Sequence, residues 1–168
     1  ICGIDIKKKK FDITGVEIMC GSQSDNSFLK SVVSKYQNFD IIIDDGSHIS
    51  KDIISSFKYL FNHLNRDGIY IIEDLQTSYL RRYGGSRLNL NKKQTAMNFV
   101  KKLADSVNYE HNDRPFYKKN TYDGLIKSVQ FFQNIVFIQK GESKKYYYPN
   151  KEKSTIVNYI KKFISLFY

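Results

Sequence analysis

Over the first 72 residues, short apolar runs alternate with segments of helical periodicity, and this alternation limits the folds open to the chain. The apolar runs predict four strands: Ile1–Ile6, Val16–Cys20, Phe39–Ile43 and Ile69–Ile72. Asp25–Tyr36 and Asp52–Leu64 carry apolar side chains at helical spacing, and Asp25 or Asn26 is a candidate N-cap of the first helix. Alternating strands and helices favour an α/β fold with a parallel sheet over a barrel or a sandwich.

The remaining elements are predicted from the same patterns. Phe39–Ile43 is almost continuously apolar, which is typical of a strand covered on both faces. Lys92–Asn108 has the spacing of a helix. Leu125–Phe132 and Ile135–Gln139, joined by Gln133-Asn134, predict an antiparallel hairpin at the edge of the sheet.

A length of 168 residues fits one domain, and no linker marks a second one. The chain opens inside a predicted strand, so we expect residues 1–140 to be a partial domain that lacks its N-terminal part. Residues 141–168 form a basic tail in which apolar residues recur at helical spacing between Ile156 and Phe167. Such a helix packs on its own domain, lies on a membrane surface or docks on a partner.

The charge and the cysteine count narrow the class of protein. Lys and Arg exceed Asp and Glu by 27 − 17, which gives a net charge of +10 and favours anionic partners. Two cysteines do not make a disulfide framework, and no signal peptide is recognisable, so we expect a cytoplasmic protein. The apolar runs are too short to span a membrane.

Acidic residues follow three of the predicted strands. Asp5 ends the first, Asp44 and Asp45 follow the third, and Glu73 and Asp74 follow the fourth. In a doubly wound sheet, ligands bind beyond the carboxyl ends of the strands. Several carboxylates gathered there would repel one another unless a cation or a ligand compensates for their charge.

Each acid has two interpretations at this stage. Asp5 is placed either to bind ribose hydroxyls or to act as a surface turn residue beside the basic run Lys7–Lys10. Asp45, Glu73 and Asp74 offer the oxygen ligands that Mg²⁺ prefers, although Asp44 or Asp74 could equally cap a helix or pair with a basic side chain. The spacing of cysteines and histidines does not fit a structural zinc site.

Polar residues of other types complete the candidate site. His48 follows Asp45 by three residues and could act as a general base, because imidazole exchanges protons near neutral pH; it could also be an ordinary residue at a helix start. Ser22 and Gln23 could contact an adenine edge or serve as turn residues. The loop Tyr79–Gly85 is a candidate lid or acceptor contact, or a solvated loop.

Three of these segments together resemble a known family. Phe39–His48 (FDIIIDDGSH), Ile69–Gly85 (IYIIEDLQTSYLRRYGG) and Gly21–Asp25 (GSQSD) are similar to the metal-dependent sugar O-methyltransferases of macrolide biosynthesis, to which cephalosporin hydroxylase-like proteins are related. The similarity runs from Gly3 to about Gly141. It implies the Rossmann-like fold of class I S-adenosylmethionine-dependent methyltransferases.

The resemblance also implies roles for particular residues. The residues implied for S-adenosylmethionine are Asp5, at its ribose, and Ser22, Gln23 and Asp44. The implied ligands of Mg²⁺ are Asp45, Glu73 and Asp74. The implied general base is His48. The acceptor would be the hydroxyl of a sugar-containing small molecule or glycan precursor, and the protein a homo-oligomer. The glycine-rich loop that follows the family's first strand has no counterpart in this sequence.

Three other functions remain open on the sequence. A relative with the same cofactor and metal could modify a non-sugar hydroxyl, such as that of an antibiotic or a phenolic compound. A methyltransferase-like domain without its cofactor loop could be inactive. The charge of +10 and the 25 aromatic residues (13 Tyr and 12 Phe) would also suit a nucleic-acid-binding module. We consider nucleic acid the weaker alternative, because the aromatic residues mostly fall at core spacing and the lysines are scattered.

Overall fold

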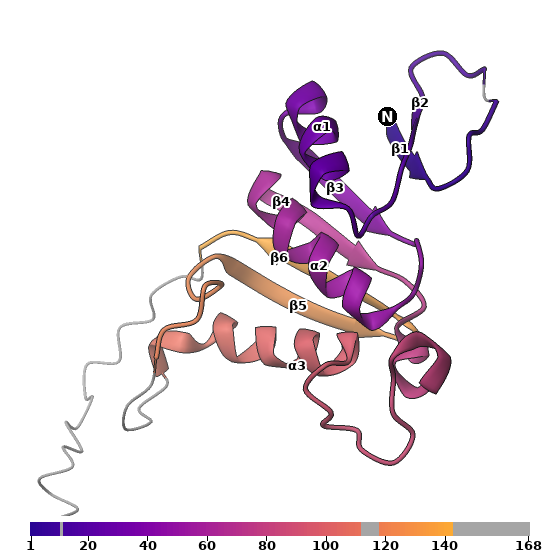
Figure 1. Ribbon diagram of the computed structural model, residues 1–168. Helices are drawn as coiled ribbons and strands as arrows, with labels where there is room; N and C mark the ends of the chain where they lie inside the picture. Colours follow the sequence, from indigo (N-terminus) through magenta and orange to yellow (C-terminus); the bar gives the residue numbers. More distant parts are fainter. Residues whose placement is uncertain (11, 112–117, 143–168) are drawn as a thin grey trace, which may run out of the picture.

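The computed structural model describes residues 1–10, 12–111 and 118–142, and these residues form two sheets (Figure 1). The smaller sheet pairs β1 (Cys2–Asp5) in parallel with β2 (Glu17–Cys20). The larger one has the order β3-β4-β6-β5. Its strands are β3 (Phe39–Asp44), β4 (Leu64–Ile72), β5 (Ile126–Phe132) and β6 (Ile135–Lys140). β3 and β4 are parallel, whereas β6 runs antiparallel to both of its neighbours.

Three helices in the described residues pack against one another beside the larger sheet (Figure 1). They are α1 (Asn26–Tyr36), α2 (Ser50–Leu60) and α3 (Ala96–Val107). Short 3₁₀ turns follow at Phe61–His63, Leu75–Tyr79, Arg81–Tyr83 and Tyr109–His111. The order of strands and helices is the predicted α/β alternation, and the hairpin of β5 and β6 lies at the sheet edge as expected.

Two expectations about the sheet are wrong for the described residues. β1 and β2 do not join the larger sheet, because β3 is hydrogen-bonded to β4 alone. Nor is β3 covered on both faces: Ile41 and Ile43 are 60% and 59% exposed. Side chains alternate across a strand, so Ile42 packs on the core while its two neighbours point to the face that no described helix covers.

Local sequence explains where the helices begin and end. Asp25 is the N-cap of α1, since its carboxylate accepts hydrogen bonds from the backbone N–H groups of Ser27 (2.9 Å) and Phe28 (3.3 Å). The predicted helix over Asp52–Leu64 ends earlier, at Leu60, and β4 already begins at Leu64. Gly68 lies inside β4, where a Cβ atom would come within 2.9 Å of the carbonyl oxygen of Asp40.

Aromatic packing on Phe57 holds α2 against the sheet. The Phe57 ring is fully buried and lies 4.9 Å from both Phe61 and Tyr70, 5.3 Å from Phe99 and 5.5 Å from Tyr122, measured between ring centroids. These partners come from the 3₁₀ turn after α2, from β4, from α3 and from the segment before β5. The cluster therefore sets the position of α2 and of the loop that enters it.

The basic tail from residue 143 onwards, with its predicted amphipathic helix, lies outside the described residues. Within them, no helix combines the length and the apolar character needed to cross a membrane.

We predict that Phe57→Ala lowers the free energy of unfolding by about 3–5 kcal/mol, because it removes the ring shared by four aromatic neighbours and leaves a cavity. Leu88→Ala is the matched control, since Leu88 is 96% exposed, and it should change stability by less than about 0.5 kcal/mol. Urea unfolding followed by circular dichroism measures both. Equal stability of the two variants would contradict the placement of Phe57 at the centre of the core.

Candidate active site

A cavity of about 490 Å³ lies between β1 and β3, the facing edges of the two sheets. Its lining includes residues Cys2–Ile6 and Ile41–Asp44, together with the segments Gly21–Gln23 and Asp45–Ser47. Five of the residues singled out in the sequence line it: Asp5, Ser22, Gln23, Asp44 and Asp45. The cavity runs alongside β1 and β3 as well as beyond their carboxyl ends, so it extends further than the crevice predicted from the strand ends.

Three side chains meet at the carboxyl ends of β3 and β4. Asp45, His48 and Asp74 each offer one ligand atom, and these atoms all lie within 4.8 Å of one another. His48 Nε2 is 3.6 Å from Asp74 Oδ2 and 4.0 Å from Asp45 Oδ1. The side chains of Asp45 and Asp74 are 60% and 48% exposed, so a ligand can reach this group from solvent.

The backbone is unusual at two of these three residues. His48 has φ 57° and Asp74 has φ 51°, which places both in the left-handed region. Such a conformation costs a residue other than glycine about 1–3 kcal/mol and persists only where surrounding contacts hold it. Two of the five non-glycine residues with positive φ among the described residues therefore belong to the side-chain cluster.

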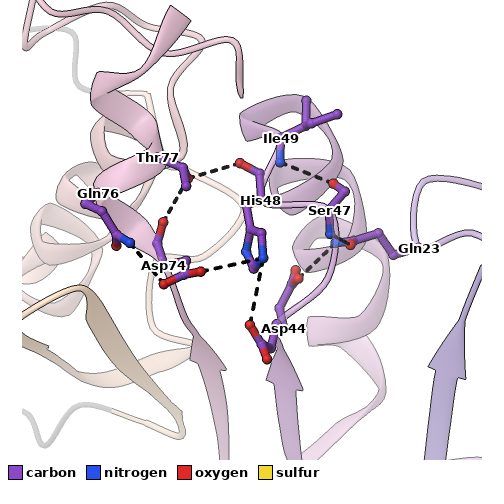
Figure 2. Close-up of polar contacts among 9 residues, drawn as sticks. Gln23, Asp44, Ser47, His48, Ile49, Asp74, Gln76 and Thr77 are labelled. Atoms are coloured by element: carbon purple, nitrogen blue, oxygen red, sulfur yellow. Dashed lines mark hydrogen bonds and ion pairs between the residues drawn. The ribbon is translucent and has the colours of Figure 1, made fainter. Parts of the chain in front are cut away.

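Polar neighbours hold the loops that carry the cluster (Figure 2). The Thr77 hydroxyl lies 2.8 Å from the carbonyl oxygen of Asp74 and 3.1 Å from that of His48. Gln76 Nε2 donates a hydrogen bond to Asp74 Oδ1 (3.0 Å), which leaves Oδ2 facing His48. Both orienting residues belong to the 3₁₀ turn that follows Asp74.

Glu73 is the one predicted metal ligand that the structure does not place in the cluster. It is half-buried, and its backbone N–H donates to the carbonyl oxygen of Asp44 (3.0 Å), which extends the pairing of β3 and β4 by one step. Its carboxylate is not among the ligand atoms that lie within 4.8 Å of one another.

Asp44, directly before the cluster, is buried in a hydrogen-bond network. Its carboxylate accepts hydrogen bonds from Gln23 Nε2 (2.8 Å), Ser56 Oγ (2.7 Å) and, at 3.4 Å, the Tyr70 hydroxyl. Burial raises the pKa of Asp44, and the hydrogen bonds from Ser56 and Gln23 counter part of that rise. Burial also raises the pKa of the Tyr70 hydroxyl far above its usual value.

Gln23 uses both ends of its amide inside the protein. While Nε2 donates to Asp44, Oε1 accepts the backbone N–H of Ser47 at 2.6 Å. Gly46 makes room for this contact, since a Cβ atom there would come within 1.8 Å of Gln23 Oε1. Gln23 therefore fastens the loop that bears Asp45 and His48 to the buried carboxylate of Asp44.

The two remaining cofactor candidates lie on the cavity wall. Asp5 accepts the backbone N–H of Lys7 (2.7 Å) and lies 3.4 Å from Lys9 Nζ, and the bond from Lys7, followed by that from Lys9, lowers the pKa of its carboxyl. Asp5 is therefore both a turn residue beside the basic run and part of the cavity lining. Ser22 Oγ lies 2.9 Å from Ser24 Oγ.

The predicted loop Tyr79–Gly85 reaches the same site. The ring of Tyr83 meets the His48 ring edge to face, with centroids 6.4 Å apart. The Cζ atom of Arg82 lies over the Tyr83 ring, 4.8 Å from its centroid. This loop borders the cluster on the side of His48.

Sequence reasoning did not assign the supporting residues Thr77, Gln76, Ser56 and Tyr70. Thr77 and Gln76 belong to the segment Ile69–Gly85 that resembles the methyltransferase family, but the sequence did not indicate what either residue does. Ser56 interrupts the apolar side of α2 between Ile53 and Phe57, and a polar residue on such a stripe indicates a buried hydrogen bond.

Comparison with known proteins relates this geometry to one group of enzymes. No family model matches the chain. The chain is 34% identical over 143 residues to the demethylmacrocin O-methyltransferase of Streptomyces fradiae, which covers 84% of this chain and 36% of that enzyme. It is 33% identical over 149 residues to the mycinamicin VI 2''-O-methyltransferase of Micromonospora griseorubida, which covers 85% and 36%. The L-olivosyl-oleandolide 3-O-methyltransferase of Streptomyces antibioticus is 46% identical over 115 residues, with coverage of 68% and 28%.

Solved structures agree with the sequence comparison. The MycE methyltransferase of the mycinamycin biosynthetic pathway, in complex with Mg and SAH, superimposes with a TM-score of 0.82 at 29% identity, over 96% of this chain and 41% of that one. The complex with Mg, SAH and mycinamycin VI gives 0.76 at 31% identity, over 89% and 38%. The fold is thus that of part of a methyltransferase, and the homologues are sugar O-methyltransferases. The chain spans little more than a third of the length of the first two relatives.

We predict that Gln23→Ala lowers the free energy of unfolding by about 1–3 kcal/mol, because it removes a hydrogen bond to the buried Asp44 carboxylate and the acceptor of the Ser47 N–H. Gln130→Ala, at an exposed glutamine of β5, is the matched control and should change stability by less than about 0.5 kcal/mol. Chemical denaturation of both variants tests this. A Gln23→Ala variant as stable as Gln130→Ala would mean that the network does not hold the loop.

Proposed function

We propose that this chain is the S-adenosylmethionine- and Mg²⁺-binding part of an O-methyltransferase that acts on a sugar hydroxyl. The observation that carries the proposal is the convergence of Asp45, His48 and Asp74 at the ends of two parallel strands, beside a cavity large enough for a small ligand. It is supported by homologues that are sugar O-methyltransferases and by structural neighbours that contain Mg and SAH.

The residues of the cluster fit a magnesium ion. Mg²⁺ binds proteins through one or two carboxylates and keeps several water molecules, and Asp45 and Asp74 offer two carboxylates that are open to water. In this proposal both are ligands. Glu73, whose carboxylate lies outside this group of atoms, would have to turn toward the ion to be the third ligand. His48 stands within reach of the acceptor rather than in the ligand set, because imidazole is a poor ligand for this ion.

The cavity between β1 and β3 is the proposed cofactor site. Asp5 would accept hydrogen bonds from the ribose hydroxyls, and Ser22 would lie near the adenosine. Gln23 and Asp44 line the same cavity, but their polar atoms are engaged with the protein and with each other. Their proposed contribution to cofactor binding is therefore the shape of the cavity wall.

The reaction would transfer a methyl group in line from the sulfonium to the sugar oxygen. Bound Mg²⁺ supplies orientation of the acceptor oxygens and a lower pKa of the reacting hydroxyl. His48 would take the hydroxyl proton on Nε2, the ring nitrogen that faces Asp45 and Asp74. Tyr83 lies beside His48 and Arg82 lies over the Tyr83 ring, and both would border the acceptor.

The names of the relatives indicate the kind of acceptor. Two of the relatives above are named for mycinamicin VI and for L-olivosyl-oleandolide, and a further one, from Streptomyces olivaceus and 33% identical over 142 residues, is named for a rhamnosyl tetracenomycin. We therefore propose a sugar-containing small molecule as the substrate. Because the chain covers about a third of those enzymes, catalysis by the whole protein belongs to this proposal too. A homo-oligomeric state and a cytoplasmic location stay predictions.

We predict that the chain binds Mg²⁺ and that Asp74→Asn weakens this binding at least about tenfold, because a ligand carboxylate loses its charge. Asp12→Asn is the control, since Asp12 is exposed and outside the cavity lining. Isothermal titration with MgCl₂, and then with S-adenosylmethionine, measures both sites. A wild-type chain that binds neither, but shifts oligonucleotides in a salt-dependent manner, would favour the nucleic-acid-binding alternative. Binding of neither ligand nor nucleic acid would favour an inactive domain.

We also predict that His48→Ala lowers turnover by about 10²–10⁴-fold and leaves S-adenosylmethionine binding intact, because it removes only the general base. The assay follows S-adenosylhomocysteine release with a rhamnosyl glycoside, in a polypeptide that contains these residues. His63→Ala is the control, since His63 lies at the far end of α2 beside Tyr59. Undiminished methyl transfer by His48→Ala would remove His48 from the role of base.

A further inference from the structure

We propose that Thr77 is a positioning residue whose hydroxyl holds His48 and Asp74 in register with each other. The inference rests on the proposed function, because it assigns the geometry of the metal and base site to a side chain that is itself neither a proposed metal ligand nor the proposed base. It concerns residues of this chain alone, so part of it can be tested without metal or substrate.

The Thr77 hydroxyl contacts both loops that carry the cluster. Its Oγ1 lies 2.8 Å from the carbonyl oxygen of Asp74 and 3.1 Å from that of His48, so one hydroxyl proton is shared between two acceptors (Figure 2). Thr77 is only 5% exposed, and water therefore competes little for this proton. The hydroxyl joins a loop after β3 to a loop after β4.

The two acceptors are not ordinary residues. His48 and Asp74 are the two members of the cluster with positive φ, and their side chains approach to 3.6 Å. The direction of a side chain follows from the orientation of its own peptide groups. A hydrogen bond that fixes both carbonyl groups therefore also fixes the directions of both side chains. It keeps both residues in the left-handed conformation, which is unfavourable without such contacts.

Thr77 itself is held by the scaffold. Its backbone N–H donates to the Asp74 carbonyl oxygen (3.0 Å), and the N–H of Leu75 donates to the carbonyl oxygen of Asn134 in the turn between β5 and β6 (2.9 Å). Leu75 is buried to 1% exposure. The turn that carries Thr77 is therefore anchored to the hairpin, and the hydroxyl transmits that anchoring to the cluster.

The decisive experiment compares Thr77→Val with Thr77→Ser. Valine keeps the shape of threonine without the hydroxyl, and serine keeps the hydroxyl without the methyl group. In metal-free protein, Thr77→Val should speed amide hydrogen exchange in residues 45–49 by about tenfold or more. It should also raise the dissociation constant for Mg²⁺ by about 10–100-fold, as the loss of an orienting partner does at metal sites. Thr77→Ser should stay within about threefold of wild type in both measurements.

Thr95→Val is the matched control for a general loss of stability. Thr95 is also a buried threonine, and its hydroxyl accepts the N–H of Asn98 at the start of α3. This variant should melt at a lower temperature than wild type and keep the Mg²⁺ affinity of wild type. Reduced affinity in Thr95→Val equal to that in Thr77→Val would assign the effect to stability and overturn the proposal.

Two further results would overturn it. One is wild-type exchange and affinity in Thr77→Val; the other is an equal loss in Thr77→Ser, which would make the methyl group responsible. If wild-type protein binds no Mg²⁺, the proposed function fails. The exchange rates in metal-free Thr77→Val and Thr77→Ser then still decide whether the hydroxyl orders the loop.

Discussion

The parallel pairing of β3 with β4 is the constraint on which the candidate site depends. Asp44 lies opposite Ile72 in this register, and the N–H of Glu73 donates to the Asp44 carbonyl oxygen one step further. Both strands therefore end at the same level, and the residues that follow them leave the sheet side by side. Two carboxylates and an imidazole converge there because the backbone hydrogen bonds determine where each strand stops.

Convergence of like charges would by itself push the two loops apart, so buried polar contacts are needed to hold them. Gln23 ties the first loop to the buried Asp44 carboxylate, and Thr77 ties the first loop to the second. Asp44 is tolerated inside because its oxygens accept several hydrogen bonds. Contacts from residues outside the cluster thus compensate for the unfavourable backbone conformation of His48 and Asp74.

Much of the fold could be predicted from patterns that depend on local physics. The α/β alternation, the β5–β6 hairpin and Asp25 as an N-cap candidate follow from side-chain periodicity, turn residues and a carboxylate beside free N–H groups. The separation of β1 from β3 could not be predicted, because edge pairing depends on distant segments. The exposure of Ile41 and Ile43 has the same origin, since an apolar strand does not specify which of its faces a helix will cover.

The sequence by itself determined which side chains could take part in the site: acids at the strand ends, a histidine three residues beyond one of them, and segments that resemble a methyltransferase family. Only the tertiary structure decided which of them meet. It brought Asp45, His48 and Asp74 together, left the Glu73 carboxylate outside that group and engaged Gln23 with Asp44. The physical reason is that distances of 3–5 Å between side chains depend on strand register and on loop backbone angles. Thr77 and Gln23 set these through hydrogen bonds between residues far apart in the chain.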